Sequence, residues 1–187
     1  MINQIKIIVV SGILLFLGFN TSAQDTQTDN HTITVVVPSV ALLDLETAAT
    51  RNFTSTFVQP TPLEAGQKLT VPSNNTGLWL NYSSIIGGLV ISRKVAVKVS
   101  ALVPGVDIAV AAAASSTGAG TRGTSASAVT LTAVDQDLIT GIGSAYTNTG
   151  ASNGHNLTYS FTALDANYGA LRAASPTVTV TYTLIDN

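Results

Sequence analysis

Apolar and polar residues alternate along much of the chain after about the first thirty positions. In residues 177–184 (TVTVTYTL) four apolar side chains fall on one side and four threonines on the other. Residues 94–100 (KVAVKVS) and 156–163 (NLTYSFTA) repeat this pattern, and residues 128–134 (AVTLTAV) follow it less strictly. A period of two is that of a β-strand with one face buried and the other in water. The pattern therefore predicts strands.

Further short apolar segments bring the expected number of strands to about eight to ten. The prolines fall between these segments or at their starts, where a missing N–H disturbs a strand ladder least. Many short strands separated by turn residues indicate an all-β fold, an antiparallel Greek-key or immunoglobulin-like β-sandwich. The further expected strands are residues 32–37, 40–45, 53–58, 67–71, 78–83 and 106–111.

Two long stretches carry no clear strand pattern. Residues 115–127 (SSTGAGTRGTSAS) are built from small residues, and we interpret them as a solvated connection. The alternative is a recognition loop at one end of the sandwich, because function concentrates in loops held by a rigid scaffold. Residues 135–155 form the second long connection.

The N-terminus has the features of a secretory signal peptide. Lys6 precedes an apolar run over residues 7–19, and small residues stand at positions 21–23. The run is too short to span a bilayer as a helix, which takes about 20 residues. We expect residues 1–23 to be the signal peptide and residues 24–187 to be a single domain in which residues 24–31 are flexible. The product would be secreted by the general export pathway to the cell surface or the medium, with the periplasm as the alternative.

Composition narrows the function classes. Charged residues make up 10% of the chain, and without Lys6 the balance is seven basic against ten acidic side chains. Nucleic-acid binding needs clustered Lys and Arg, so it is not expected. The chain has no Cys, so neither disulfides nor a lipid-acceptor thiol are available. A surface this poor in charge suits contact with other proteins or with further copies of itself.

The sequence offers no catalytic constellation, so we predict a non-enzymatic protein without a cofactor. Its two histidines and lack of Cys do not supply a zinc site, and no G-x-S-x-G motif occurs. A hydrolase is the most distant alternative. Its carboxylate pair would come from Glu64, Asp135, Asp137 or Asp165.

Two weaker sets of candidates concern ions and ligands. Asp135 and Asp137 lie close enough in sequence to contribute to a Ca²⁺ site, although such an ion takes six to eight oxygen ligands. A carbohydrate- or ligand-binding module is the alternative to a structural protein. Its candidate contact residues are the aromatic side chains Trp79, Tyr82, Tyr146 and Tyr168.

The first predicted strand is a candidate for strand exchange. It follows a polar segment, so it is free to leave its own domain and extend the open sheet edge of a neighbour. A head-to-tail contact of this kind does not close and produces a fibre. The sequence thus predicts a structural or adhesive cell-surface protein, with itself or other cell-envelope components as partners. The exchanged residues would be Thr32, Ile33, Thr34, Val35, Val36 and Val37.

Three segments carry a resemblance to known bacterial surface proteins. They are the opening strand at residues 32–37, the segment 77–80 (GLWL) and the closing strand at residues 178–186. The chain resembles WxL-type surface domains and fimbrial subunits, which implies a β-sandwich at the cell surface. Here Trp79 is followed directly by Leu80, and Tyr182 stands where a second Trp-x-Leu would begin. The resemblance therefore implies the fold and location but no binding residues.

Overall fold

The computed structural model describes residues 27–187, so the predicted signal peptide lies outside the described residues. The chain divides into two units, Met1–Val36 and Val37–Asn187, and we call the second unit the body. The described residues of the first unit are exposed and form neither helix nor strand. The sequence predicts a domain from residue 24, whereas the compact unit begins at Val37.

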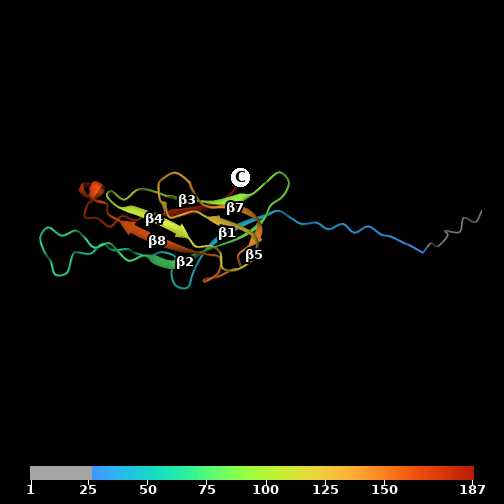
Figure 1. The fold of residues 1–187 in the computed structure, drawn as a ribbon, viewed down its shortest axis with the longest axis horizontal. Coiled ribbons are helices and arrows are strands. Elements are labelled where there is room, and N and C mark those ends of the chain that lie inside the picture. The colour runs from blue at the N-terminus through green and yellow to red at the C-terminus, as the bar shows by residue number, and fades with distance from the viewer. Residues whose placement is uncertain (1–26) are drawn as a thin grey trace, which may run out of the picture. The chain divides into compact units, whose positions relative to one another are not determined.

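The described residues form nine strands and one short 3-10 helix, so the all-β prediction is confirmed (Figure 1). Residues 27–187 contain no helix that is long and apolar enough to span a bilayer. The elements are β1 (Val40–Thr47), β2 (Asn75–Ile85), β3 (Arg93–Val99), β4 (Asp107–Ala112), β5 (Ala119–Ser125), β6 (Val129–Thr130), β7 (Gln136–Tyr146), β8 (His155–Thr162), η1 (Asp165–Ala170) and β9 (Val180–Asp186).

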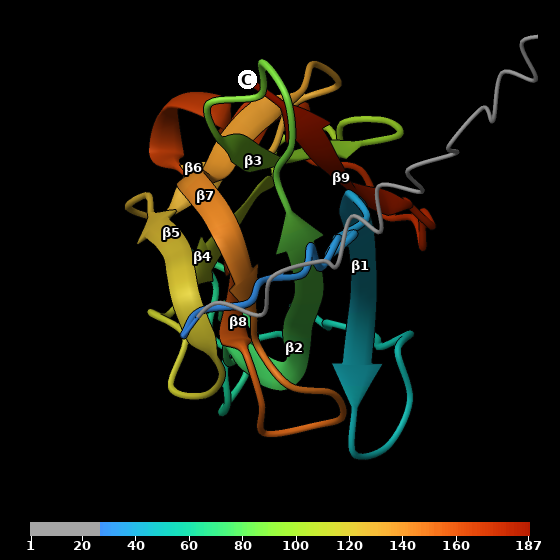
Figure 2. The ribbon, with the colours of Figure 1, turned by 90° about the vertical axis from the view of Figure 1, so that its right-hand side faces the viewer.

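All strand pairs are antiparallel and belong to one continuous sheet. Its main path runs β6-β4-β8-β2-β7-β3-β9, while β1 pairs with β2 and β5 pairs with β7. The path contains two groups of strands, β1-β2-β8-β4-β6 and β9-β3-β7-β5. Among the described strands, the two groups pair with each other only where Ser83 and Ser84 of β2 lie opposite Tyr146 and Ala145 of β7. Figure 2 shows β1 and β5 at opposite margins of the body.

One hydrophobic core receives side chains from both groups. Leu80 of β2 and Leu157 of β8 come from one group, and Val95 of β3 and Ile139 of β7 come from the other. All four are fully buried. The predicted alternation is clearest in β8, where every second side chain from His155 to Phe161 is buried. The inward face assigned from the sequence is therefore the observed one for this strand.

Several predicted strands are absent or shorter than expected. Residues 53–58 and 67–71 meet only in an isolated bridge between Val58 and Thr70. Between them the prolines at positions 60 and 62 lack the N–H that a ladder needs. Residues 32–37 carry no strand, and of residues 128–134 only β6 is paired. An apolar alternation forms a strand only where a neighbour supplies hydrogen bonds.

Two strands lie where the sequence analysis predicts connections. β5 occupies most of the small-residue tract, and β7 fills the stretch after position 135. The loop interpretation of residues 115–127 is therefore wrong. Gly120 explains the error, because its φ is 85° and a Cβ there would lie 2.2 Å from the carbonyl oxygen of Ser144 on β7. The register of β5 with β7 shifts once, between Gly120 and Arg122, and such a bulge interrupts the period of two.

Candidate strand-exchange site

Residues 32–37 form an extended, unpaired apolar segment that we call the arm. Ile33 is 73% exposed, Val35 78% and Val36 83%. Burying a side chain of this size stabilises a protein by about 1.5–3 kcal/mol. Three apolar side chains are spaced two residues apart and would lie on one face of a strand: Ile33, Val35 and Val37. The arm therefore has the composition of a buried strand without the burial.

The base of the arm, which we define as Ser39 and Val40 at the start of the body, is held in place by hydrogen bonds. The Ser39 hydroxyl donates to the carbonyl oxygen of Ile85 at 3.0 Å. The guanidinium of Arg93 donates to the Ser39 hydroxyl at 3.3 Å and also to the carbonyl oxygen of Val40. The Arg93 side chain is 4% exposed and pairs with Asp186 of β9 at 2.6 Å. Arg93 thus ties the starts of β1 and β3 to the end of β9.

β9 and β1 are open edges of the two strand groups. Among residues 27–187, β9 pairs only with β3, and β1 pairs only with β2. The two edges lie next to each other without pairing. Their core-facing side chains are only partly buried, whereas Val95 and Val97 of the adjacent β3 are at 0% exposure. These partly buried side chains are Leu43, Leu45, Val180, Tyr182 and Leu184.

The open side of β9 therefore has both unpaired backbone groups and apolar side chains that an added strand would cover. Six arm residues in strand conformation span about 20 Å. β9 has seven residues, so it is long enough to receive the whole arm. The alternation of the arm supplies one row of apolar side chains. This row matches the partly buried row of β9, which is Val180, Tyr182 and Leu184.

The sequence-predicted aromatic candidates do not come together. Tyr82 is 3% exposed and faces the core. Trp79 lies on the opposite face of β2, Tyr146 ends β7, and Tyr168 belongs to η1. The Tyr168 hydroxyl accepts a hydrogen bond from the backbone N–H of Leu69 at 3.3 Å. Within residues 27–187 the arrangement offers no shared aromatic platform.

Three of the four carboxylate candidates, all except Glu64, are paired with a lysine. Lys98 lies 3.2 Å from Asp135, and Lys94 lies 2.9 Å from Asp137. Asp165 pairs with Lys68 of another segment. The described residues contain no cluster of three His, Asp or Glu side chains that would hold a metal ion. The described residues therefore show no ready set of Ca²⁺ ligands at Asp135 and Asp137.

A buried polar network is the feature that sequence reasoning missed. The Tyr82 hydroxyl lies 2.9 Å from His155 Nε2 and donates to the carbonyl oxygen of Arg122 on β5. His155 Nδ1 lies 2.8 Å from the carbonyl oxygen of Ala113 and 3.4 Å from the Ser125 hydroxyl. The signal was available, because His155 is in phase with the inward-facing residues of β8. A polar residue in an apolar row predicts a buried network.

Burial sets the protonation of this network. Desolvation raises the pKa of Tyr82 well above its ordinary value, and the nearby Arg122 opposes this rise. Desolvation also lowers the pKa of His155, so the imidazole is neutral at neutral pH. The network joins β2, β5 and β8 across the core. Among the described residues, the His155 ring has hydrogen-bond partners in Tyr82, Ser125 and Ala113 and none in a carboxylate. The network therefore lacks the acid that orients the histidine in a Ser-His-Asp triad.

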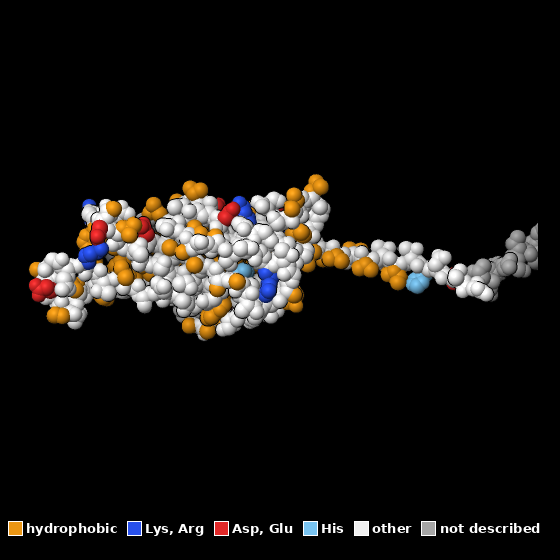
Figure 3. Space-filling view, viewed as in Figure 1, with side chains coloured by type: hydrophobic (Ala, Val, Ile, Leu, Met, Phe, Trp, Pro, Cys, Tyr) orange, Lys and Arg blue, Asp and Glu red, His pale blue; other side chains and the backbone are white. Residues whose placement is uncertain are grey.

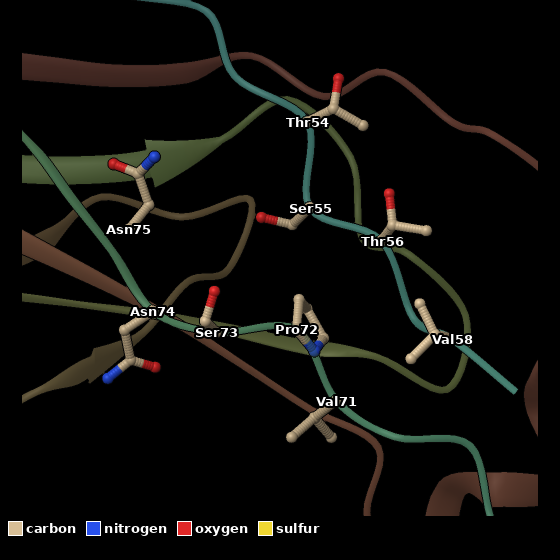
Figure 4. A pocket seen from close by; sticks show the side chains of 9 residues that line it. All are labelled: Thr54, Ser55, Thr56, Val58, Val71, Pro72, Ser73, Asn74 and Asn75. Carbon is tan, nitrogen blue, oxygen red and sulfur yellow. The ribbon is translucent and has the colours of Figure 1, made fainter. Parts of the chain in front are cut away.

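A cavity of about 400 Å³ opens in the long β1–β2 connection. Figure 4 shows its two walls, residues 54–58 and 71–75, with the hydroxyls of Ser55 and Ser73 directed into the space between them. The bridge between Val58 and Thr70 closes one end through backbone hydrogen bonds of 3.1 and 2.9 Å. The lining contains hydroxyls, amides and aliphatic groups but no charge, so the cavity suits an uncharged polar ligand.

Charged side chains are sparse on the face of the molecule seen in Figure 3, as the composition leads one to expect. The chain matches no protein-family model, no curated protein and no solved structure. The resemblance to WxL-type domains and fimbrial subunits therefore stays a prediction.

Proposed function

We propose that the chain is an exported, non-catalytic structural protein of the cell surface whose copies assemble by strand addition. The exposed arm carries the proposal, because its apolar side chains stabilise a structure only when another surface buries them. In the assembly, the arm of one copy adds to the β9 edge of the next. Repetition of this head-to-tail contact yields a filament with a structural or adhesive role.

β9 is a better acceptor than the other edge of its strand group. β5 contains one Ala, one Arg and otherwise Gly, Thr and Ser, which give an added strand no apolar row to cover. Its pairing with β7 is shifted between Gly120 and Arg122, and such bulges discourage edge-to-edge pairing. β9 instead keeps Val180, Tyr182 and Leu184 partly buried beside a regular register with β3. The β9 edge therefore offers an added strand both hydrogen bonds and hydrophobic burial.

The proposal is tested with a matched pair of arm variants. In a strand, Val35 would face the partner's core and Thr34 would face solvent, so Val35→Asp buries a charge and Thr34→Asp does not. We expect filaments or large oligomers of the wild-type protein and of Thr34→Asp in size-exclusion chromatography and negative-stain microscopy. Val35→Asp should remain monomeric, as should a protein lacking residues 24–37.

A strictly monomeric wild-type protein at high concentration would rule out assembly. Equal assembly by both aspartate variants would show that the arm is not the contact. Fractionation of cells that make the protein, combined with microscopy, tests the proposed surface location at the same time.

A second candidate function is the binding of an uncharged ligand such as a carbohydrate, favoured by the hydroxyl- and amide-lined cavity. These groups are of the kind that hydrogen-bond to sugar hydroxyls. Glycan-array binding that is lost in Ser55→Val, with Ser116→Val as a surface control, would support this function. Binding that instead disappears in Trp79→Ala would locate the ligand on the outer face of β2.

A further inference from the structure

The turn between β2 and β3, residues 86–92 (IGGLVIS), exposes large apolar side chains. Leu89 is 99% exposed and Ile91 is 86% exposed. Gly87 and Gly88 precede them, and the turn contains no charged residue. Apolar side chains this exposed and this close together mark an interaction surface more often than an ordinary turn.

The turn flanks the point where the arm leaves the body. Ile85, at its start, pairs with Val40 and accepts the hydrogen bond from Ser39. A Cβ on Gly87 would lie 3.8 Å from the Cβ of Ser39. Arg93, at its end, holds Ser39 and Val40. Both ends of the turn are therefore fixed beside the base of the arm.

Only Pro38 separates the arm from the fixed Ser39. Proline restricts its own φ and favours an extended conformation in the residue before it, so Val37 and Pro38 form a short, stiff connection. One residue spans at most about 3.6 Å. A copy that holds residues 32–37 as a strand must therefore lie directly against the arm's base, where the turn is.

We infer that residues 86–92 form the second half of the assembly contact, with Leu89 and Ile91 packed against the copy that holds the arm. This inference rests on the proposed function. A second copy fits better than a lipid surface, because membrane-surface segments combine apolar residues with Lys, Arg or Trp, and this turn has none. The arm tethers the two bodies, so even a small apolar contact adds greatly to the lifetime of the joint.

The test separates the turn from the arm. Leu89→Ser combined with Ile91→Ser removes both exposed apolar groups, and Leu102→Ser combined with Val134→Ser is the control at exposed positions elsewhere on the body. We expect the turn variant to dissociate about tenfold faster or more in dilution experiments followed by light scattering. The control should behave as the wild type, and both variants should keep their thermal midpoints.

A peptide-binding assay distinguishes failure of the inference from failure of the proposed function. The full-length Val35→Asp protein, whose own arm is disabled, is titrated with a synthetic peptide of residues 30–38, with and without the two turn substitutions. We expect unchanged peptide affinity, because the peptide brings no body and forms no joint. Normal filament lifetime in the turn variant would overturn the inference and leave strand addition intact.

The remaining outcomes are equally decisive. Loss of peptide binding in the turn variant would overturn the inference by showing that the turn belongs to the acceptor edge. Binding of the wild-type protein to phosphatidylcholine–phosphatidylglycerol vesicles through Leu89 and Ile91 would assign the turn to a lipid surface instead. A wild-type protein that neither assembles nor binds the peptide would overturn the proposed function, and the inference with it.

Discussion

The two edges of the β9-β3-β7-β5 group differ in how they meet a neighbour. β9 is a regular strand whose apolar row is partly buried and whose outer backbone groups are unpaired. β5 is polar, and its pairing with β7 is shifted and held close by glycine. Bulges and small polar residues protect an edge, while a regular apolar edge invites another strand. One sheet thus combines a finished edge with one that an arm would complete.

The largest expected effect comes from closing the space that β5 needs. In Gly120→Ala the new Cβ would meet the carbonyl oxygen of Ser144 at 2.2 Å, and the φ of 85° is unfavourable for alanine. We expect a loss of about 3 kcal/mol or more in the free energy of unfolding, measured in urea.

Gly141→Ala is the matched control on the partner strand. Gly141 has a φ of 69°, but nothing lies within 4 Å of its Cβ position. Its loss should be about 1 kcal/mol, from the backbone conformation alone. Equal losses in the two variants would mean that close approach does not hold β5 in place.

Arg93 ties the start of β1 to the end of β9, and its removal should have the second-largest effect. Arg93→Met removes the ion pair with Asp186 and the hydrogen bonds to Val40, Ile85 and Ser84. Because these acceptors lose a buried charged donor, we expect a loss of about 2 kcal/mol in urea unfolding. Lys94→Met breaks the partly exposed pair with Asp137 and should lose less than about 1 kcal/mol. A larger effect at Lys94 would contradict this account.

A third prediction follows from the buried network that links β5 to β8. Because burial lowers the pKa of His155 below 6.5, the unfolded chain takes up a proton at a higher pH than the folded chain. The contribution of the neutral imidazole is complete above about pH 6.5 and is lost as the pH falls toward the lower folded-state pKa. Stability measured by urea unfolding should decline over this window in the wild type and less in His155→Gln. A wild-type stability that rises on acidification would reverse the sign.

The smallest expected effect tests the acidic residues on β7 and before it. Asp135 and Asp137 are each held by a lysine, so calcium has no prepared ligand set. Millimolar CaCl₂ or EDTA should leave the thermal midpoint unchanged. If CaCl₂ instead raised the thermal midpoint of the wild type and not that of Asp135→Asn, the predicted ion site would be restored.

Local alternation predicted the regular strands and could not predict the bulged ones. In β9, valine, tyrosine and leucine alternate with threonine, and the inward residues are those expected. In β5, glycines permit an approach that only the partner strand makes visible, so the tract resembles a loop. The arm shows the opposite limit, because its pattern is that of a strand but no partner pairs with it among the described residues. The network of Tyr82 and His155 depends on contacts between strands that are distant in sequence. Its one sequence signal is that His155 falls in the inward-facing row of β8.

Amide hydrogen exchange tests the difference between the two edges most directly. The full-length Val35→Asp protein is compared with and without an excess of the peptide of residues 30–38. We expect new protection in β9, Val180–Asp186, and unchanged exchange in β5, Ala119–Ser125. Protection that appears in β5, or in neither strand, would contradict this expectation.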